Sequence, residues 1–206
     1  MYDGSNRCFP EIDTEYFELH LRGDEEATER FRNNKQSFLN PIYRVIKELN
    51  LCGKIEHLTV SASESHECSQ ICPYDPWPSK RLWLYIYKHR YMEKELLRHE
   101  FQHEADRWNK DMGYDNEIEK QWKRNPTWTW ALNLAANISV DARLDKHRQG
   151  LGKAIRRKDF IDEISKECLD IFEHAWENPP TTWQDIDDLA MRLVELRPNA
   201  TSKGQY

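Results

Sequence analysis

The stretch that decides the fold is LLRHEFQHEADRW, from Leu96 to Trp108. It contains the HExxH pattern at His99 to His103, which reads HEFQH. On a helix, residues four positions apart lie on one face, one turn above the other, so both imidazoles can bind the same metal ion. Glu100 projects beside them, where it can take a proton from a water on the metal. The pattern therefore predicts a metal site that supports hydrolysis.

The surrounding sequence favours this interpretation over a chance match. Leu82 to Tyr87 (LWLYIY) alternates and is rich in aromatic residues, which is typical of a strand. We expect a helix from about Met92 to Met112, because no Pro or Gly interrupts it before Gly113. Apolar residues also recur at helical spacing along that segment. The motif therefore lies on a helix that follows a strand, which is the placement that the chemistry needs.

Length and composition predict one globular domain. The chain has 206 residues, of which 38% are hydrophobic, and its eight Trp and nine Tyr supply large apolar surfaces. The expected fold class is α+β, mostly helical, with a small β-sheet, the HExxH helix, a second ligand-bearing helix and C-terminal helices. We divide the chain into an irregular segment (1–23), a catalytic core (24–150), a helical addition (151–197) and a flexible tail (198–206).

Charge and cysteine usage limit the partners and the compartment. A net charge of -6 argues against nucleic acid as the main partner. The short basic run Lys153 to Lys158 (KAIRRK) is typical of a solvated surface. The chain has neither an apolar signal core nor a run long enough to cross a bilayer, so we expect a cytoplasmic protein without a membrane partner. Five Cys, an odd number, fit reduced thiols better than a disulfide framework.

The N-terminal half predicts one helix and one further strand. The helix is expected to begin at Asp24, to be interrupted near Pro41 and to end near Gly53. Lys54 to Ala62 alternates and predicts a strand, whereas residues 63–80 are rich in Pro, Ser and Cys and predict an ordered loop. In zinc peptidases a strand beside the cleft commonly holds the substrate as an additional strand, but the sequence does not say which strand lies at an edge.

The C-terminal half predicts three helices. The first begins with Pro126 at its first helical position and continues to Gly150. The second extends from Asp159 to Trp176 and the third from Thr182 to Leu196. Thr182 and Asp185 resemble a capping box at the start of the third helix.

A second zinc site is a weaker possibility within the Pro-rich loop. His66, Cys68 and Cys72, together with Cys52 or His57, supply ligand types that zinc prefers. Their spacing lacks the paired Cys-x2-Cys knuckle of structural sites, so we favour buried free thiols.

A catalytic zinc ion takes three protein ligands and leaves one position for water, so the two His need another donor. Asp106 lies about 10 Å along the helix axis from His99 and reaches poorly. Glu104 points away from the His pair. A donor from another helix is therefore required.

Asp141 is the better third ligand. Asn137, Asp141 and Asp145 lie four positions apart and form a polar face on an otherwise apolar helix. Asp141 can bind the metal, while Asp145 can accept the free ring N–H of a ligand His and orient it. The alternatives are a solvated polar stripe or an Asp-to-Arg pairing on the surface.

These residues resemble the zincin metallopeptidases of the gluzincin type. In that group an acid on a second helix completes the HExxH site, and an Asp follows it four residues later. The family pattern is ExxxD, and here Asp141 and Asp145 give DxxxD. Asn137 to Asp141 (NISVD) is also similar to the N-I-x-x-D that follows HExxH in a group of predicted bacterial and archaeal metallopeptidases. The resemblance covers His99 to Asp145, roughly a quarter of the 206 residues.

The resemblance implies a zincin-like core with one catalytic Zn2+ ion. His99, His103 and Asp141 would bind the ion, and Glu100 would act as general base. Asp145 would support a ligand His, and Asn137 shares its face. Because Asp is shorter than Glu, His147 and Asp145 stay open as substitutes for the third ligand.

The implied function is that of a zinc metallopeptidase acting on a peptide or protein substrate. No residue can be matched to the family's transition-state donor, which is usually a His or a Tyr. Tyr114, His147, Arg148 and His174 are candidates without further support. This gap leaves two alternatives open: a non-catalytic zinc-binding interaction module, whose structural zinc would have four protein ligands, and a metal-free helical adaptor.

Overall fold

A computed structural model describes residues 12–13, 18–23, 29, 35–63, 70–73, 80–87, 94–112, 126–147 and 149–197. The chain divides into two compact units, Met1–Ala105 and Asp106–Tyr206. The predicted boundary after residue 150 does not coincide with this division. The described residues form an α+β structure with more helix than strand, which confirms the predicted class at that level.

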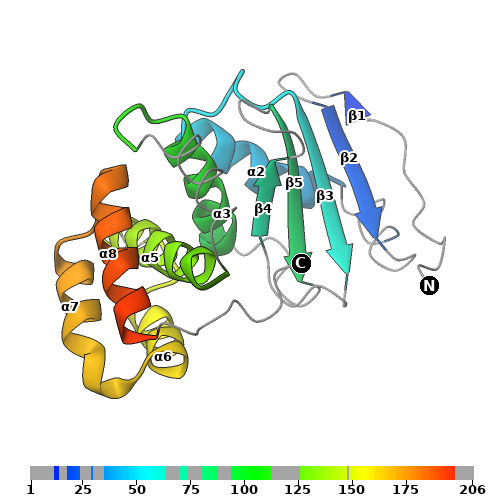
Figure 1. Ribbon diagram of the computed structural model, residues 1–206. Helices are drawn as coiled ribbons and strands as arrows, with labels where there is room; N and C mark the ends of the chain where they lie inside the picture. The colour runs from blue at the N-terminus through cyan, green and yellow to red at the C-terminus, as the bar shows by residue number, and fades with distance from the viewer. Residues whose placement is uncertain are drawn as a thin grey trace. The chain divides into compact units, whose positions relative to one another are not determined.

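The first unit contains a five-stranded sheet with the order β1-β2-β3-β5-β4 (Figure 1). β2, β3 and β5 are parallel, whereas β1 is antiparallel to β2 and β4 is antiparallel to β5. Among the described residues, β4 is therefore the edge strand next to β5. The strands are β1 (Ile12–Asp13), β2 (Glu18–Gly23), β3 (His57–Ser63), β4 (Gln70–Pro73) and β5 (Arg81–Tyr87).

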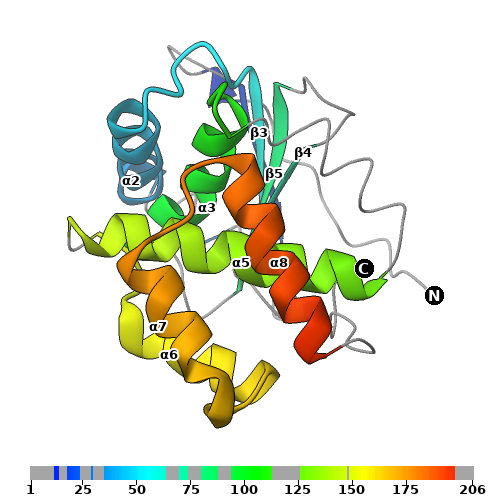
Figure 2. The same cartoon turned by 60° about the vertical axis from the view of Figure 1, so that its left-hand side comes forward.

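Alternating apolar residues explain why β3 and β5 form strands, and both predicted strands are confirmed. Leu58 of β3 pairs with Leu82 of β5, and Val60 pairs with Leu84. All four side chains are buried, and such cross-strand apolar pairs stabilise a sheet. Figures 1 and 2 show two helices on one face of this sheet: α2 (Lys35–Glu48) and α3 (Lys94–Arg107).

Helix α2 continues through Pro41, so the predicted interruption there is wrong. Proline inside a helix removes one backbone hydrogen bond and is unfavourable by about 3 kcal/mol. Ile42, Val45 and Ile46 are nearly fully buried just beyond it, and burial of three such side chains offsets that cost. Of the predicted helix before Lys35, only Glu29 lies within the described residues.

Three short strands differ from the sequence-based expectation. Residues 1–23 are predicted to be irregular, but β1 occupies Ile12–Asp13 and β2 occupies Glu18–Gly23, where Leu19 and Leu21 alternate with polar residues. The expected loop at residues 63–80 contains β4. Pro73 ends that strand, a position that an edge strand tolerates because no ladder hydrogen bond from its nitrogen is needed there.

The second unit consists of helices, with α5 packed against α6, α7 and α8 (Figure 2). Pro126 begins α5 as predicted, although the helix ends at Asp145 rather than near Gly150. No helix among the described residues is long and apolar enough to cross a lipid bilayer. The helices are α5 (Pro126–Asp145), α6 (Lys153–Glu163), α7 (Leu169–Glu177) and α8 (Trp183–Leu196).

The predicted helix from Asp159 to Trp176 is two helices, α6 and α7. Between them the Ser165 hydroxyl accepts a hydrogen bond from the Glu167 amide and starts a short 3-10 turn, Lys166–Cys168. Ser competes with helical hydrogen bonds in this way, which explains the break. The basic run is the beginning of α6, and its Lys153 forms an ion pair of 2.6 Å with Glu173 of α7.

The predicted capping box at the start of α8 is confirmed. The Thr182 hydroxyl accepts from the Asp185 amide at 3.2 Å, and the Asp185 carboxylate accepts from the Thr182 amide at 3.0 Å.

We expect Thr182→Ala to lower the free energy of unfolding by about 1 kcal/mol, because one amide loses its acceptor. Chemical denaturation at neutral pH measures this loss. Thr181→Ala is the matched control, since it keeps the backbone amide that donates to Asp185.

The same cap makes stability depend on pH. The Thr182 side chain, followed by the Thr181 amide, holds the pKa of Asp185 below its usual value. A lowered folded pKa contributes stability at pH above the unfolded pKa, and this contribution is lost as pH falls through the folded pKa. Thr182→Ala should therefore lose less stability than the wild type between neutral pH and about pH 3. An unchanged acid profile would contradict this origin of the shift.

Candidate metal site

The HExxH motif lies on α3, as predicted from its spacing. Leu97 and Phe101 of this helix are nearly fully buried, which fixes the rotation of the helix against the core of the first unit. His99 and Glu100 are 3% and 5% exposed. Buried polar side chains require partners, so the motif is not a solvated surface.

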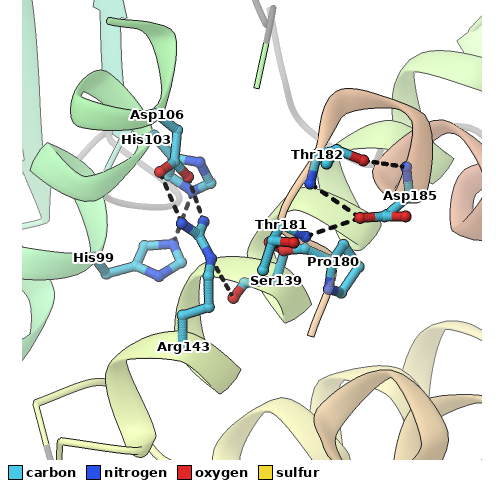
Figure 3. A network of polar contacts seen from close by, with 9 residues as sticks. All are labelled: His99, His103, Asp106, Ser139, Arg143, Pro180, Thr181, Thr182 and Asp185. Atoms are coloured by element: carbon cyan, nitrogen blue, oxygen red, sulfur yellow. Dashed lines mark hydrogen bonds and ion pairs between the residues drawn. The ribbon is translucent and has the colours of Figure 1, made fainter. Parts of the chain in front are cut away.

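The two imidazoles face each other on one side of α3 (Figure 3). Their Nε2 atoms are 3.2 Å apart, and the ring planes are nearly perpendicular, at 88°. Two nitrogens bound tetrahedrally to zinc at about 2.0–2.1 Å would be about 3.3 Å apart. The donor pair therefore fits a shared zinc ion. The same separation also suits a hydrogen bond between rings of opposite tautomer.

Glu100 points toward the edge strand of the sheet. Its Oε2 atom accepts a buried hydrogen bond of 2.9 Å from the backbone amide of Ile71 in β4. The sequence gives no signal for this contact, because Ile71 lies in a stretch whose Pro, Ser and Cys content predicts a loop. The proposed base is thus attached to the sheet as well as to its own helix.

An ion pair connects α3 to α2 at the residue before the motif. The buried guanidinium of Arg98 pairs with Glu48, which also pairs with Arg44 at 3.0 Å. Burial, followed by the charge of Arg44, lowers the pKa of Arg98. Arg98 therefore has a structural role, holding the helix that carries the imidazoles within the first unit.

In the second unit Asp106, which the sequence analysis rejected as a ligand, forms a two-pronged ion pair with Arg143 of α5 (Figure 3). Arg143 Nη1 donates to Asp106 Oδ1 at 2.9 Å, and Nε donates to the Ser139 carbonyl at 3.2 Å. The Ser139 hydroxyl in turn donates to the Pro180 carbonyl at 2.8 Å. Both carboxylate oxygens of Asp106 therefore bind Arg143 of α5.

Asp141 is fully buried on α5, which excludes the solvated stripe as an explanation for this residue. Its Oδ2 atom pairs with Arg156 of α6, and its Oδ1 atom accepts from the Leu151 amide at 3.4 Å. Arg156 also contacts Asp159 at 3.2 Å. The alternative of an Asp-to-Arg pairing is thus observed, in the interior rather than on the surface. The role of Asp141 as third zinc ligand stays a prediction.

The other candidate site residues differ in exposure, and several lie outside the described residues. Asn137 and Asp145 are half-buried on α5, while His147 and His174 are exposed. Tyr114, Arg148, His66, Cys68 and the side chain of Cys72 lie outside the described residues. Cys52 and Cys168 are free thiols. Within the described ranges, no group of three or more His, Cys, Asp or Glu side chains is gathered closely enough to hold a metal ion.

Three partners of these acids were not predicted from the sequence. They are the Ile71 amide for Glu100, Arg143 for Asp106 and Arg156 for Asp141. Only Arg156 carried a signal, as part of the basic run that begins α6. Comparison with protein-family models, with curated proteins and with solved structures finds no match to this chain.

Proposed function

We propose that this chain is a zinc-dependent metallopeptidase with Glu100 as its general base. The observation that carries the proposal is the 3.2 Å separation of the His99 and His103 Nε2 atoms. Imidazole nitrogens are preferred zinc ligands, and this separation is close to what tetrahedral coordination requires. Glu100 follows the first imidazole on the same helix, as a base for this chemistry must.

Each residue has a proposed task. His99 and His103 would hold the ion, with Asp141 as the proposed third ligand. When bound, zinc would lower the pKa of its water and polarise the substrate carbonyl. Glu100 would accept the proton of the attacking water and pass it to the leaving amine. Among the described strands β4 lies at an edge of the sheet, which supports a peptide substrate, because an extended peptide can pair with an edge strand through its backbone.

A non-catalytic zinc-binding interaction module is the second candidate. It is favoured by the buried contact between Glu100 and the Ile71 amide, which gives the proposed base a structural role in the first unit. A structural zinc site has four protein ligands and no position for water, whereas a catalytic site has three. The two candidates therefore differ in the number of protein donors.

Metal analysis tests the proposal directly. Protein purified without added zinc should contain about one zinc ion per chain, because the proposed site would hold the ion through both imidazoles and a third protein ligand. His103→Ala should lose the metal, and His174→Ala, an exposed His on α7, is the matched control.

An anomalous-scattering map of crystals of the purified protein then counts the ligands. Three protein donors and an open position support the peptidase, while four protein donors support the interaction module. Protein that binds no zinc, even when zinc is supplied, would contradict both candidates.

A further inference from the structure

We infer that the backbone amide of Ile71 is a positioning group for Glu100, so that the edge strand β4 sets the orientation of the base. This inference rests on the proposed function, because it assigns a task to a contact of the proposed base. The contact joins residues 29 positions apart at an N···O distance of 2.9 Å. Both residues belong to the first unit.

The pairing of β4 explains why this amide is available to Glu100. Ile71 is opposite Leu84 in an antiparallel ladder, in which successive residues direct their backbone groups alternately toward and away from the neighbouring strand. The Ile71 amide donates to Glu100, so it points away from β5. Two residues later the same outer edge has Pro73, which has no amide hydrogen. Within residues 70–73, the amide on this outer edge therefore donates to Glu100.

Burial makes the contact a strong constraint. Glu100 is 5% exposed and Ile71 is 7% exposed, so water competes little for either group. A hydrogen bond from an amide to a carboxylate is shorter and stronger than one between neutral groups. Ile71 also anchors β4 in the core, opposite the buried Leu84. The carboxylate is therefore held between a helix and a sheet.

Orientation of the base matters for catalysis. A general base must lie within hydrogen-bond reach of the proton that it removes. Misplacement by about 1 Å can lower the rate by about 100-fold. Loss of the amide hydrogen should thus act on turnover more than on substrate binding.

An amide-to-ester replacement at residue 71, made with the α-hydroxy analogue of isoleucine, tests this directly. It removes the N–H and keeps the side chain. With a fluorogenic peptide selected from a library, we expect kcat to fall at least about 10-fold, with KM and zinc content nearly unchanged. The matched control is an ester at Cys72, whose amide faces β5 and should therefore affect stability without lowering kcat. A kcat that is equal in the two esters would overturn the inference.

A measurement on metal-free protein supplies a readout that does not depend on activity. The NMR signal of the Ile71 amide should shift in Glu100→Gln, because its acceptor loses its charge. It should stay in place in Glu95→Gln, a control at an exposed position of the same helix. An Ile71 signal that is unmoved by Glu100→Gln would show that the contact does not form in solution.

The outcomes separate the inference from the proposed function. If Glu100→Gln hydrolyses peptides at the wild-type rate, the proposed function fails, whatever the ester does. If Glu100→Gln is inactive and the residue 71 ester keeps its kcat, only the positioning role fails. Should the ester not fold, Ile71→Pro removes the same hydrogen, and Ile71→Val, which retains it, should preserve kcat.

Discussion

Replacing Glu100 with Gln is expected to lower the rate of peptide hydrolysis by about 10²- to 10⁴-fold while zinc stays bound, which is the range attributed to general-base catalysis. The Gln side chain has nearly the same size, and its carbonyl oxygen can still accept from the Ile71 amide. It cannot accept a proton from water. The substitution thus removes the proposed chemistry and leaves the surrounding hydrogen bonds in place.

Hydrolysis of an unfolded protein substrate such as casein, followed by the release of new amino termini, provides the measurement. Glu95→Gln is the control, since Glu95 is exposed in the first turn of α3. Zinc content and thermal unfolding of both variants must match the wild type, so that a loss of rate reports on chemistry alone. Undiminished turnover in Glu100→Gln would remove this residue from the mechanism.

Local periodicity explains which parts of the fold could be predicted. β3, β5, α3 and α5 have apolar residues at regular spacing, which predicts these elements. In β3 and β5 burial follows the alternation, whereas buried residues surround most of α5. β2 and β4 are short, and each is defined by a partner distant in sequence: Leu19 pairs with Leu58, and Ile71 pairs with Leu84. A pattern of four to six residues does not specify such partners, so these strands were missed.

The same distinction applies to the candidate site. His99 and His103 are neighbours on one helix, so their approach follows from helical geometry alone. The partner of Glu100 is 29 residues away, and that of Asp141 is 15 residues away. Ionic and hydrogen-bonding partners at such separations depend on how strands and helices pack. Sequence spacing could therefore identify the two metal donors, but not the groups that bind the carboxylates of Glu100 and Asp141.

The buried pair of Asp141 and Arg156 leads to the largest expected effect on stability. Arg156→Met should lower the free energy of unfolding by about 3–5 kcal/mol, because it leaves a fully buried carboxylate without its cation. Urea denaturation gives the value. The matched control is Arg157→Met on the same helix. Arg157 forms an exposed pair with Glu173 at 3.1 Å, so its loss should cost no more than about 1 kcal/mol.

A double variant shows whether the effect comes from this pair. Asp141→Asn combined with Arg156→Met should be more stable than the sum of the single losses predicts, because neither charge is then left without its partner. Additive losses would mean that the two residues stabilise the unit independently.

Zinc titration of the single variants separates the two roles of Asp141. If its carboxylate is the third ligand, Asp141→Asn weakens zinc binding, whereas Arg156→Met, which keeps the carboxylate, does not. If the carboxylate serves α5 and α6 alone, both variants lose stability and both retain the wild-type affinity for zinc.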